Sequence, residues 1–251
     1  MDLQLGDKTA LVTGASTGIG RGIALALAAE GVRLAIAARR LALLNELAEE
    51  IVSQGGHRPV VIESDLYADD AAQTLTDAAM AGLGGVDILV NNAGGSRSFT
   101  ELHVSEERWQ EAMTLNFHRP RQVAQALLDQ MMARNWGRII NITGKSEPDH
   151  VNGAFCAKAG MHSWAKGLSR MVGKNGITVN SISPGRINSE QILRNYTPAY
   201  RQWQCDNEIP VGRYGEPQDM ANLVCFLASP LASYITGAVI PVDGGLRRYQ
   251  F

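Results

Sequence analysis

The residues with the clearest chemical meaning form a glycine-rich turn near the start of the chain. Residues 13–20 read Thr-Gly-Ala-Ser-Thr-Gly-Ile-Gly, with glycines at Gly14, Gly18 and Gly20. A short apolar segment precedes them, and a segment of helical periodicity follows at once. Such a turn lets the backbone approach a pyrophosphate, whose charge is favoured by unpaired N–H groups and by the helix dipole. We predict a dinucleotide-binding turn, the alternative being a turn that only lets a strand and a helix pack.

The elements that must position this turn alternate between short apolar runs and longer segments with apolar residues three and four apart. This alternation is typical of parallel strands joined by crossover helices. Strands are predicted at 9–13, 33–37, 59–63, 88–91, 138–142, 178–182 and 239–242, and helices at 19–29, 41–52 and 106–132. The pattern predicts an α/β fold, a single Rossmann domain with a doubly wound parallel sheet and helices on both faces. The expected strand order, 3-2-1-4-5-6-7, is the one that the family resemblance described below implies.

Composition limits the classes of partner. The 251 residues suit one α/β domain over 1–251, and their formal charge of −2 gives no basic footprint for nucleic acid or an anionic membrane. No apolar run approaches the roughly 20 residues of a spanning helix, and residues 1–8 lack the core of a signal peptide. We therefore expect a cytoplasmic protein with a small-molecule substrate. Cys156, Cys205 and Cys225 fit neither a disulfide framework nor a metal site, so no metal is expected.

The spacing of the glycine turn, TGxxxGxG, resembles the short-chain dehydrogenase/reductase family, and the resemblance extends over almost the whole chain. Further family motifs are Asn91-Asn92-Ala93-Gly94 after a strand, Asn116, Lys158 and Pro184-Gly185. Residues 209–213 and 237–245 look like the closing segments of bacterial 3-oxoacyl-(acyl-carrier-protein) reductases. The resemblance implies an oxidoreductase that moves hydride between a nicotinamide dinucleotide and a carbonyl or secondary alcohol.

The resemblance also implies roles for individual residues around the cofactor. The phosphates would be surrounded by Gly14, Ser16, Thr17 and Ile19, within the turn that Gly18 and Gly20 complete, and the adenine would be bordered by Asp65 and Leu66. The ribose and nicotinamide would be lined by Asn92, Ala93 and Gly94. The carboxamide would be contacted by Ile187 and Ser189, which follow the turn of Pro184 and Gly185. The hydroxyls of the nicotinamide ribose would be held by Lys158. The alternative for residues 91–94 is a simple strand-ending turn.

The end of the second predicted strand bears on the choice of cofactor. An acidic residue there would bind the adenosine ribose and repel a 2′-phosphate, but this chain has Arg39 and Arg40. Arginine offers a fork of donors suited to phosphate, which favours NADP(H) and assigns Arg39 to its binding. NAD(H) stays possible, because relatives specific for NADP(H) often carry a basic residue where this chain has Thr17. The two arginines could also be solvated residues at a helix start.

Two groups on which the chemistry of the family depends are missing. The family uses a tyrosine as proton donor four residues before the lysine on one helix face, and Ala154 stands at that position. Gly144 stands where a serine would hold the substrate oxygen, and the stretch 144–154 is shorter than in the family. Asn116 and Lys158 remain as catalytic candidates. Asn116 could instead be a polar residue that bends its helix by bonding to the backbone.

Other side chains are candidates to replace the missing groups. We predict that Ser146, two residues past the vacant position, binds the substrate oxygen, with Lys145, His150 and Cys156 as further candidates. A lone loop histidine is more often simply solvated. Lys145 and Arg186 follow strand ends on the expected active face, where their charges would attract an acidic or phosphate-bearing substrate. The alternative is that both are solvated loop cations.

Two functions remain compatible with these residues. The preferred one is an NADP(H)-dependent oxidoreductase similar to 3-oxoacyl reductases. The alternative is a dinucleotide-binding protein without redox turnover, such as a regulator or partner subunit, or a lyase or isomerase on the same scaffold. The polar, aromatic region 184–214 is expected to bind the substrate. Residues 235–251 are expected to pack in a homotetramer or homodimer, or else to form a last strand with a frayed tail.

Overall fold

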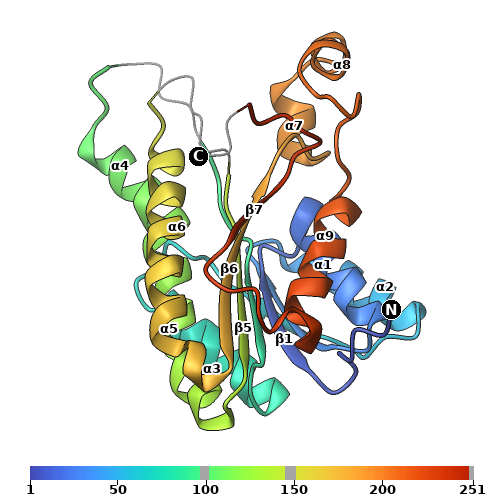
Figure 1. Ribbon diagram of the computed structural model, residues 1–251, viewed down its shortest axis with the longest axis vertical. Helices are drawn as coiled ribbons and strands as arrows, with labels where there is room; N and C mark the ends of the chain where they lie inside the picture. Colours follow the sequence, from blue (N-terminus) through green and yellow to red (C-terminus); the bar gives the residue numbers. More distant parts are fainter. Residues whose placement is uncertain (97–101, 145–150, 249–251) are drawn as a thin grey trace.

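Seven parallel strands form one sheet in the order β3-β2-β1-β4-β5-β6-β7 (Figure 1). The computed structural model describes residues 1–96, 102–144 and 151–248. The strands are β1 (Thr9–Thr13), β2 (Arg33–Ala38), β3 (Val60–Glu63), β4 (Ile88–Asn91), β5 (Gly137–Ile142), β6 (Ile177–Pro184) and β7 (Val239–Val242). The predicted fold class and strand order are confirmed. Every residue of β1, β4 and β5 is buried, which is why apolar residues predominate in these strands.

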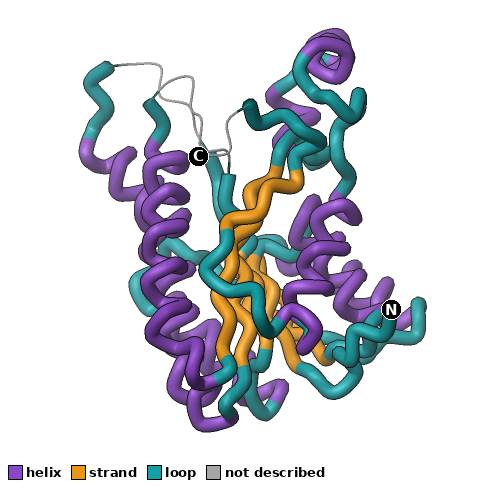
Figure 2. The backbone as a smooth tube through the Cα atoms, in the orientation of Figure 1, coloured by secondary structure: helices purple, strands orange, loops and turns teal. Residues whose placement is uncertain are grey.

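Helices cover both faces of the sheet (Figure 2). One face is packed by α1 (Gly18–Ala29), α2 (Leu41–Ser53) and α9 (Pro217–Ala228), and the other by α3 (Ala71–Leu83), α5 (Arg119–Arg134) and α6 (Gly153–Val172). Ile23 and Leu27, four residues apart on α1, are fully buried in the same cluster as Val224 of α9. The helical spacing of apolar residues therefore supplies the surface that packs on the sheet. No helix of the described residues is long and apolar enough to span a membrane.

The predicted long helix at 106–132 is interrupted. It consists of α4 (Glu106–Met113), a π-helical turn η1 (Thr114–His118) and α5. Pro120, in the first turn of α5, has no N–H to donate to the carbonyl of Asn116, and its ring would crowd that carbonyl in a regular α-helix. The extra residue of a π-turn relieves this conflict. Periodicity did not reveal the interruption because apolar residues continue on both sides of it.

The region 184–214 contains two short helices, α7 (Glu190–Asn195) and α8 (Pro198–Asn207). Each begins at a hydroxyl cap, because Ser189 Oγ accepts from Ile192 N and Thr197 Oγ1 accepts from Tyr200 N. Both helices lie beyond the carboxyl end of β6 (Figure 1). They stand at the edge of the sheet where ligands bind in open parallel sheets.

Polar residues lie side by side at this carboxyl edge. Asn91 of β4 pairs in register with Asn141 of β5, which pairs with Ser181 of β6. The Asn91 side chain donates to Asn141 Oδ1 at 3.0 Å and to Pro120 O at 3.1 Å. These buried hydrogen bonds connect β4 with β5 and with α5 at the edge that carries the site.

Candidate functional site

The glycine turn between β1 and α1 has the backbone geometry that only glycine adopts readily. Gly14 and Gly18 have φ angles of 66° and 57°. A Cβ on Gly14 would lie 2.8 Å from Ala93 Cα, and one on Gly20 would collide with Gly14 O and Asn92 Nδ2. The turn is therefore tightly packed against the loop that contains Asn92 and Ala93.

The first turn of α1 keeps its N–H groups free of side-chain caps within the described residues. Thr17 is the N-cap residue, but its hydroxyl makes no capping bond and instead accepts from Arg40 Nη2 at 2.8 Å. The first turn also contains no acidic residue. Uncapped N–H groups at the positive end of a helix dipole form a site suited to an anion.

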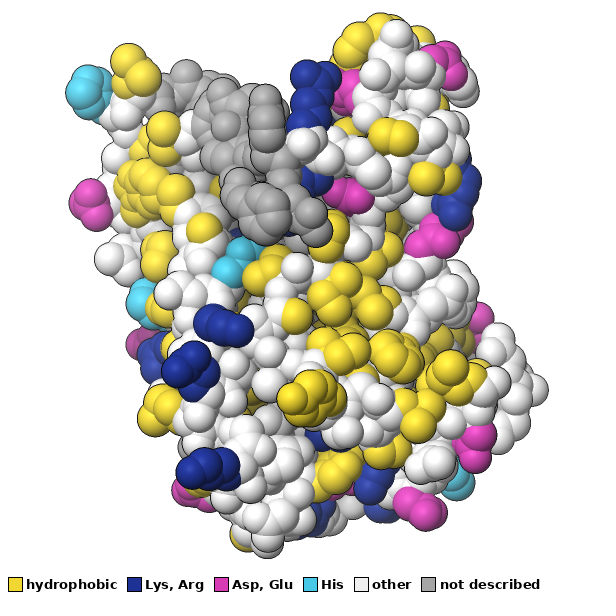
Figure 3. Space-filling model, viewed as in Figure 1, with side chains coloured by type: hydrophobic (Ala, Val, Ile, Leu, Met, Phe, Trp, Pro, Cys, Tyr) yellow, Lys and Arg dark blue, Asp and Glu magenta, His cyan; other side chains and the backbone are white. Residues whose placement is uncertain are grey.

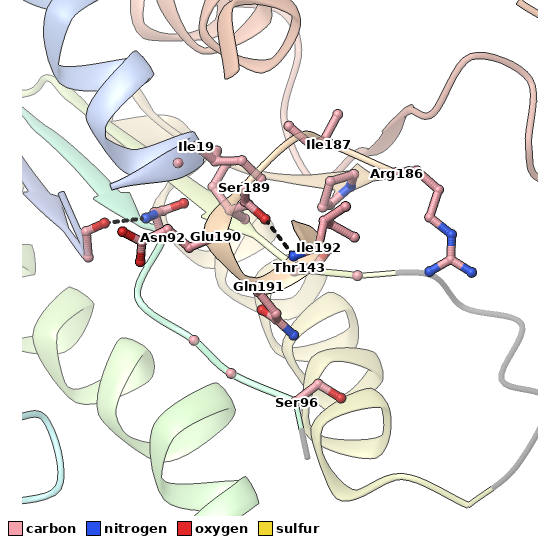
Figure 4. A pocket seen from close by; sticks show the side chains of 18 of the residues that line it. Ile19, Asn92, Ser96, Thr143, Arg186, Ile187, Ser189, Glu190, Gln191 and Ile192 are labelled. Atoms are coloured by element: carbon pink, nitrogen blue, oxygen red, sulfur yellow. Dashed lines mark hydrogen bonds between the residues drawn. The ribbon is translucent and has the colours of Figure 1, made fainter. Parts of the chain in front are cut away.

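Asn92 locks the loop after β4 against this turn (Figure 4). Its Nδ2 donates to Thr13 O at 3.0 Å and to Gly14 O at 3.1 Å. In return, Thr13 Oγ1 accepts from the N–H groups of Asn92 and Ala93 at 3.0 Å each. Two motifs about 80 residues apart in the chain thus form one rigid floor.

Two adjoining cavities, with volumes of about 410 Å³ and 610 Å³, open at this floor. Both are lined by Gly14, Ala93 and Gly94. The smaller is also lined by Thr17, Gly18, Ile19, Asn92, Lys158, Pro184, Gly185, Ile187 and Ser189, and the larger by Ser16, Arg39, Asp65 and Leu66. The structure thus brings the predicted cofactor residues together around one continuous space, except that Gly20 lies buried behind Gly14.

The two arginines after β2 differ in their contacts. Arg39 lines the larger cavity and has no hydrogen bond or ion pair with any other described residue. Arg40 donates to Thr17 Oγ1 and forms an ion pair of 2.9 Å with Glu190 of α7. Arg39 is therefore the arginine whose donors are available to a ligand.

Lys158 of α6 projects into the smaller cavity beside Thr143. Its Nζ donates to Thr143 O at 2.9 Å, and desolvation by burial lowers the pKa of Lys158 to about 8. One helical turn further on, His162 Nε2 lies 2.8 Å from Thr143 Oγ1. Burial, with Arg247 and Lys158 adding to it, lowers the pKa of His162 and favours its neutral form.

Asn116 is held by backbone groups and does not line either cavity among the described residues. Its Nδ2 donates to Gly95 O at 3.0 Å and to Ala112 O at 2.9 Å, while its Oδ1 accepts from Gly95 N at 3.2 Å. The side chain is only 4% exposed. These contacts correspond to the helix-bending alternative, and they fix the loop behind Gly94.

Ala154 and Gly144, the two positions that we predict to lack the usual catalytic groups, both lie close to Lys158 in the chain or in space. Ala154, 3% exposed, is in the first turn of α6, where Asn152 Oδ1 accepts from its N–H at 2.9 Å. A Cβ on Gly144 would lie 3.3 Å from Lys158 Cδ. The proposed substitutes Ser146, Lys145 and His150 lie outside the described residues. Cys156 is exposed and does not line either cavity.

Several residues that line the smaller cavity were not predicted, among them Ser96, Phe155, Gln191, Ile192 and Leu246. Leu246 is brought there by the C-terminal segment, in which Asp243 accepts from the N–H groups of Gly245 and Arg247. Arg247 Nη2 then donates to Ser183 Oγ at 3.0 Å. No local pattern signals these contacts, although Gln191 and Ile192 fall within the predicted substrate region.

The lowered pKa of Lys158 leads to a first prediction. In chemical acetylation over about pH 6 to 11, quantified by peptide mass spectrometry, Lys158 should be half-maximally reactive near pH 8. Since the folded-state pKa lies below the unfolded value, protonated Lys158 opposes folding below pH 8, and this penalty fades as the pH rises toward 10.5. Exposed Lys174, measured in the same digest, controls for the reagent. Reactivity of Lys158 that is still far from half-maximal at pH 10 would contradict the prediction.

Comparisons with known proteins agree with this geometry. A family model described as enoyl-(acyl carrier protein) reductase matches residues 14–247. The 3-oxoacyl-(acyl-carrier-protein) reductase of Aquifex aeolicus is 35% identical, over 98% of this chain and 100% of that protein. A proposed short-chain alcohol dehydrogenase from Sinorhizobium meliloti superposes with a TM-score of 0.91 at 34% identity, covering 98% of each chain. A 7α-hydroxysteroid dehydrogenase solved with NADH and a 7-oxo bile acid superposes with a TM-score of 0.90 at 31% identity, covering 97% of this chain and 96% of that one.

Proposed function

Since this chain belongs to the short-chain dehydrogenase/reductase family of oxidoreductases, we propose that it is a 3-oxoacyl-reductase-like enzyme that uses NADP(H) and acts on a carbonyl or secondary alcohol. One observation carries the proposal. The uncapped glycine turn opens onto two adjoining cavities, and the second of these contains Arg39 while the first contains Lys158. This arrangement suits a long ligand with a diphosphate at its centre.

The residues present fit a nicotinamide dinucleotide. The N–H groups of residues 14–19 would hold the diphosphate, Asp65 and Leu66 would border the adenine, and Ile187 and Ser189 would contact the carboxamide. Lys158, whose ammonium faces the smaller cavity, would donate to ribose hydroxyls. When bound, the nicotinamide supplies or accepts the hydride of the reaction. The tight packing beneath Gly14 and Gly20 supports this fit, because it holds the backbone of the turn in place against Asn92 and Ala93.

Arg39 is the basis for preferring NADP(H), and it gives the second prediction. Arg39→Asp should weaken NADPH binding at least about tenfold, because it removes charge-assisted donors and adds repulsion, and should leave NADH binding unchanged or stronger. The control is Arg33→Asp, which makes the same change at the exposed opposite end of β2. Fluorescence titration of both cofactors measures the effect. Tighter binding of NADH than of NADPH by the unaltered protein would reverse the preference.

Proton transfer is the step for which the usual group is missing. Ala154 carries no ionisable group, and the amide of Asn116 is used by Gly95 and Ala112. Lys158 is therefore the retained group with a polar atom at the cavity, where it would orient a water or a substitute such as Ser146 toward the substrate oxygen. A positioned acid typically contributes about 10² to 10⁴-fold, so turnover should be slow for the family.

The same vacant positions favour a second candidate function, a dinucleotide-binding protein without redox turnover or a lyase or isomerase on this scaffold. The two are separated by titrating NADPH and NADH and then following absorbance of the reduced cofactor with 3-oxoacyl thioesters, ketones and alcohols. Turnover supports the oxidoreductase, and binding without turnover supports the second candidate. Turnover that survives in Lys158→Ala would show that the centre lies elsewhere, and absence of cofactor binding would overturn both functions.

The region 184–214 and the last strand extend the proposal to substrate and assembly. Helix α7 would cover a small-molecule substrate, because Glu190, Gln191 and Ile192 already line the smaller cavity. Assembly as a homotetramer or homodimer is supported by the edge strand β7 and its surroundings. Val239 is 38% exposed and Tyr234 is fully exposed, and hydrophobic side chains gather on the face that β7 and α9 present (Figure 3).

A further inference from the structure

Arg186 occupies a fixed place at the smaller cavity. It follows Pro184 and Gly185 at the carboxyl end of β6 and lines the cavity that also contains Lys158 (Figure 4). Its carbonyl accepts from Gly215 N at 2.8 Å, and Gly215 O accepts from Asn188 N at 2.8 Å. These bonds form a parallel bridge between Ile187 and Gly215, so the backbone of Arg186 is held like that of a strand.

The guanidinium group of Arg186 is held as firmly as its backbone. It lies over the ring of Tyr196, with 4.9 Å between Cζ and the ring centroid, and Nη1 donates to the Tyr196 hydroxyl at 3.0 Å. Tyr196 stacks on Tyr200, which stacks on Trp203, with ring centroids 5.6 Å and 5.8 Å apart. Stacking on a supported ring fixes the plane of the guanidinium, which is what a binding site for a planar anion needs. Arg186 is therefore not a freely solvated loop cation.

The charge of Arg186 is not neutralised by the described part of the chain. No carboxylate among those residues forms an ion pair with it, and its Nε is buried without a hydrogen-bond partner. Glu190, the carboxylate that lines the same cavity, is paired with Arg40. A buried donor on a charged group costs free energy until a partner binds it. Within the described residues, Arg186 is thus a cation at the smaller cavity that has no carboxylate partner and can receive an anion.

The cofactor does not account for this arginine. Arg186 lines the smaller cavity and not the larger one, whereas Arg39, with its free donors, lines the larger. A 2′-phosphate of the adenosine would lie near Arg39, and the diphosphate would lie at the glycine turn. In Figure 4 the side chain of Arg186 extends away from Ile19 and Asn92, which lie at the glycine turn, so an anion bound by Arg186 would belong to the molecule that shares the smaller cavity with the nicotinamide.

We propose that Arg186 binds a carboxylate carried by the substrate, so that the enzyme acts on an oxo or hydroxy acid rather than on a neutral ketone or alcohol. This inference rests on the proposed function and adds the class of its substrate. A carboxylate suits the site because its two oxygens match the guanidinium fork. The aromatic stack from Tyr196 to Trp203 then serves to hold the fork in place.

The test compares acids with their methyl esters, which lack the charge. The protein is saturated with NADP⁺, and calorimetry measures binding of 2-oxobutanoate, acetoacetate and levulinate, of the methyl ester of each, and of methyl phosphate. We expect at least one acid to bind more tightly than its ester. Arg186→Gln should reduce binding of that acid about 10- to 100-fold while binding of the ester changes little. The corresponding kcat/KM values with NADPH should change in parallel.

One control variant and one control measurement keep the result interpretable. Arg194→Gln removes an exposed cation from the same cavity and should change acid binding much less than Arg186→Gln does. Unchanged NADPH affinity in Arg186→Gln shows that its fold and cofactor site are intact. Any of four results would overturn the inference while cofactor binding stands. These are equal binding of acids and their esters, no binding of any acid, full acid binding by Arg186→Gln, and a preference for methyl phosphate over the acids. Failure of both dinucleotides to bind would instead overturn the proposed function.

Discussion

Gly20→Ala is expected to abolish measurable dinucleotide binding and to lower the free energy of unfolding. The added Cβ would collide with Gly14 O and with Asn92 Nδ2, and neither can retreat easily. Asn92 Nδ2 is bonded to the carbonyls of Thr13 and Gly14 at 3.0 Å and 3.1 Å, so displacing it breaks the link between the two loops. We expect an affinity loss of more than about 100-fold and a stability loss of about 1–3 kcal/mol, the usual range for overpacking.

Gly167→Ala is the matched control for this change. Gly167 lies within α6, is exposed, and has nothing within 4 Å of an added Cβ. The same substitution should therefore raise stability by about 0.5–1 kcal/mol through helix propensity and leave cofactor affinity unchanged. Urea denaturation and NADPH fluorescence titration measure both variants. If Gly20→Ala bound NADPH as tightly as the unaltered protein, the glycine turn would not be the cofactor site.

Ala154→Tyr is expected to raise the rate of NADPH oxidation with a carbonyl substrate that the unaltered protein reduces. Residue 154 lies one helical turn before Lys158 on the same face of α6, so a phenol there would stand next to the ammonium of Lys158. That ammonium favours the phenolate and would bring the tyrosine into a range useful for proton transfer. We expect kcat to rise about 10- to 100-fold, less than a complete acid contributes, because Gly144 still supplies no hydroxyl.

Ala154→Phe separates the hydroxyl from the bulk of the ring. Ala154 is buried, so either ring must displace its neighbours, and both variants should lose similar stability. Only the tyrosine variant should gain rate, and its gain should disappear in Ala154→Tyr combined with Lys158→Met. Equal rates for the tyrosine and phenylalanine variants, with both folded and binding NADPH, would show that position 154 does not face the reacting oxygen.

Local patterns in the sequence were sufficient to predict the sheet and the glycine turn. A strand such as β1 reads as an apolar run because both its faces are buried, and the order of the seven strands is the one that the family resemblance implied. Gly14, Gly18 and Gly20 are informative on their own because positive φ angles and close backbone approach require glycine. Residues that depend on this turn, such as Asn92 and Ala93, follow from it through the family motif.

Other features were decided by contacts between segments that are distant in the chain. The sequence shows Arg39 and Arg40 as equivalent neighbours, and only the tertiary structure pairs Arg40 with Glu190 and leaves Arg39 at the cavity. It likewise assigns the amide of Asn116 to the backbone of Gly95, and it stacks Arg186 on Tyr196. A side chain's partner is fixed by which groups packing brings within about 3 Å of it, and local periodicity carries no information on that.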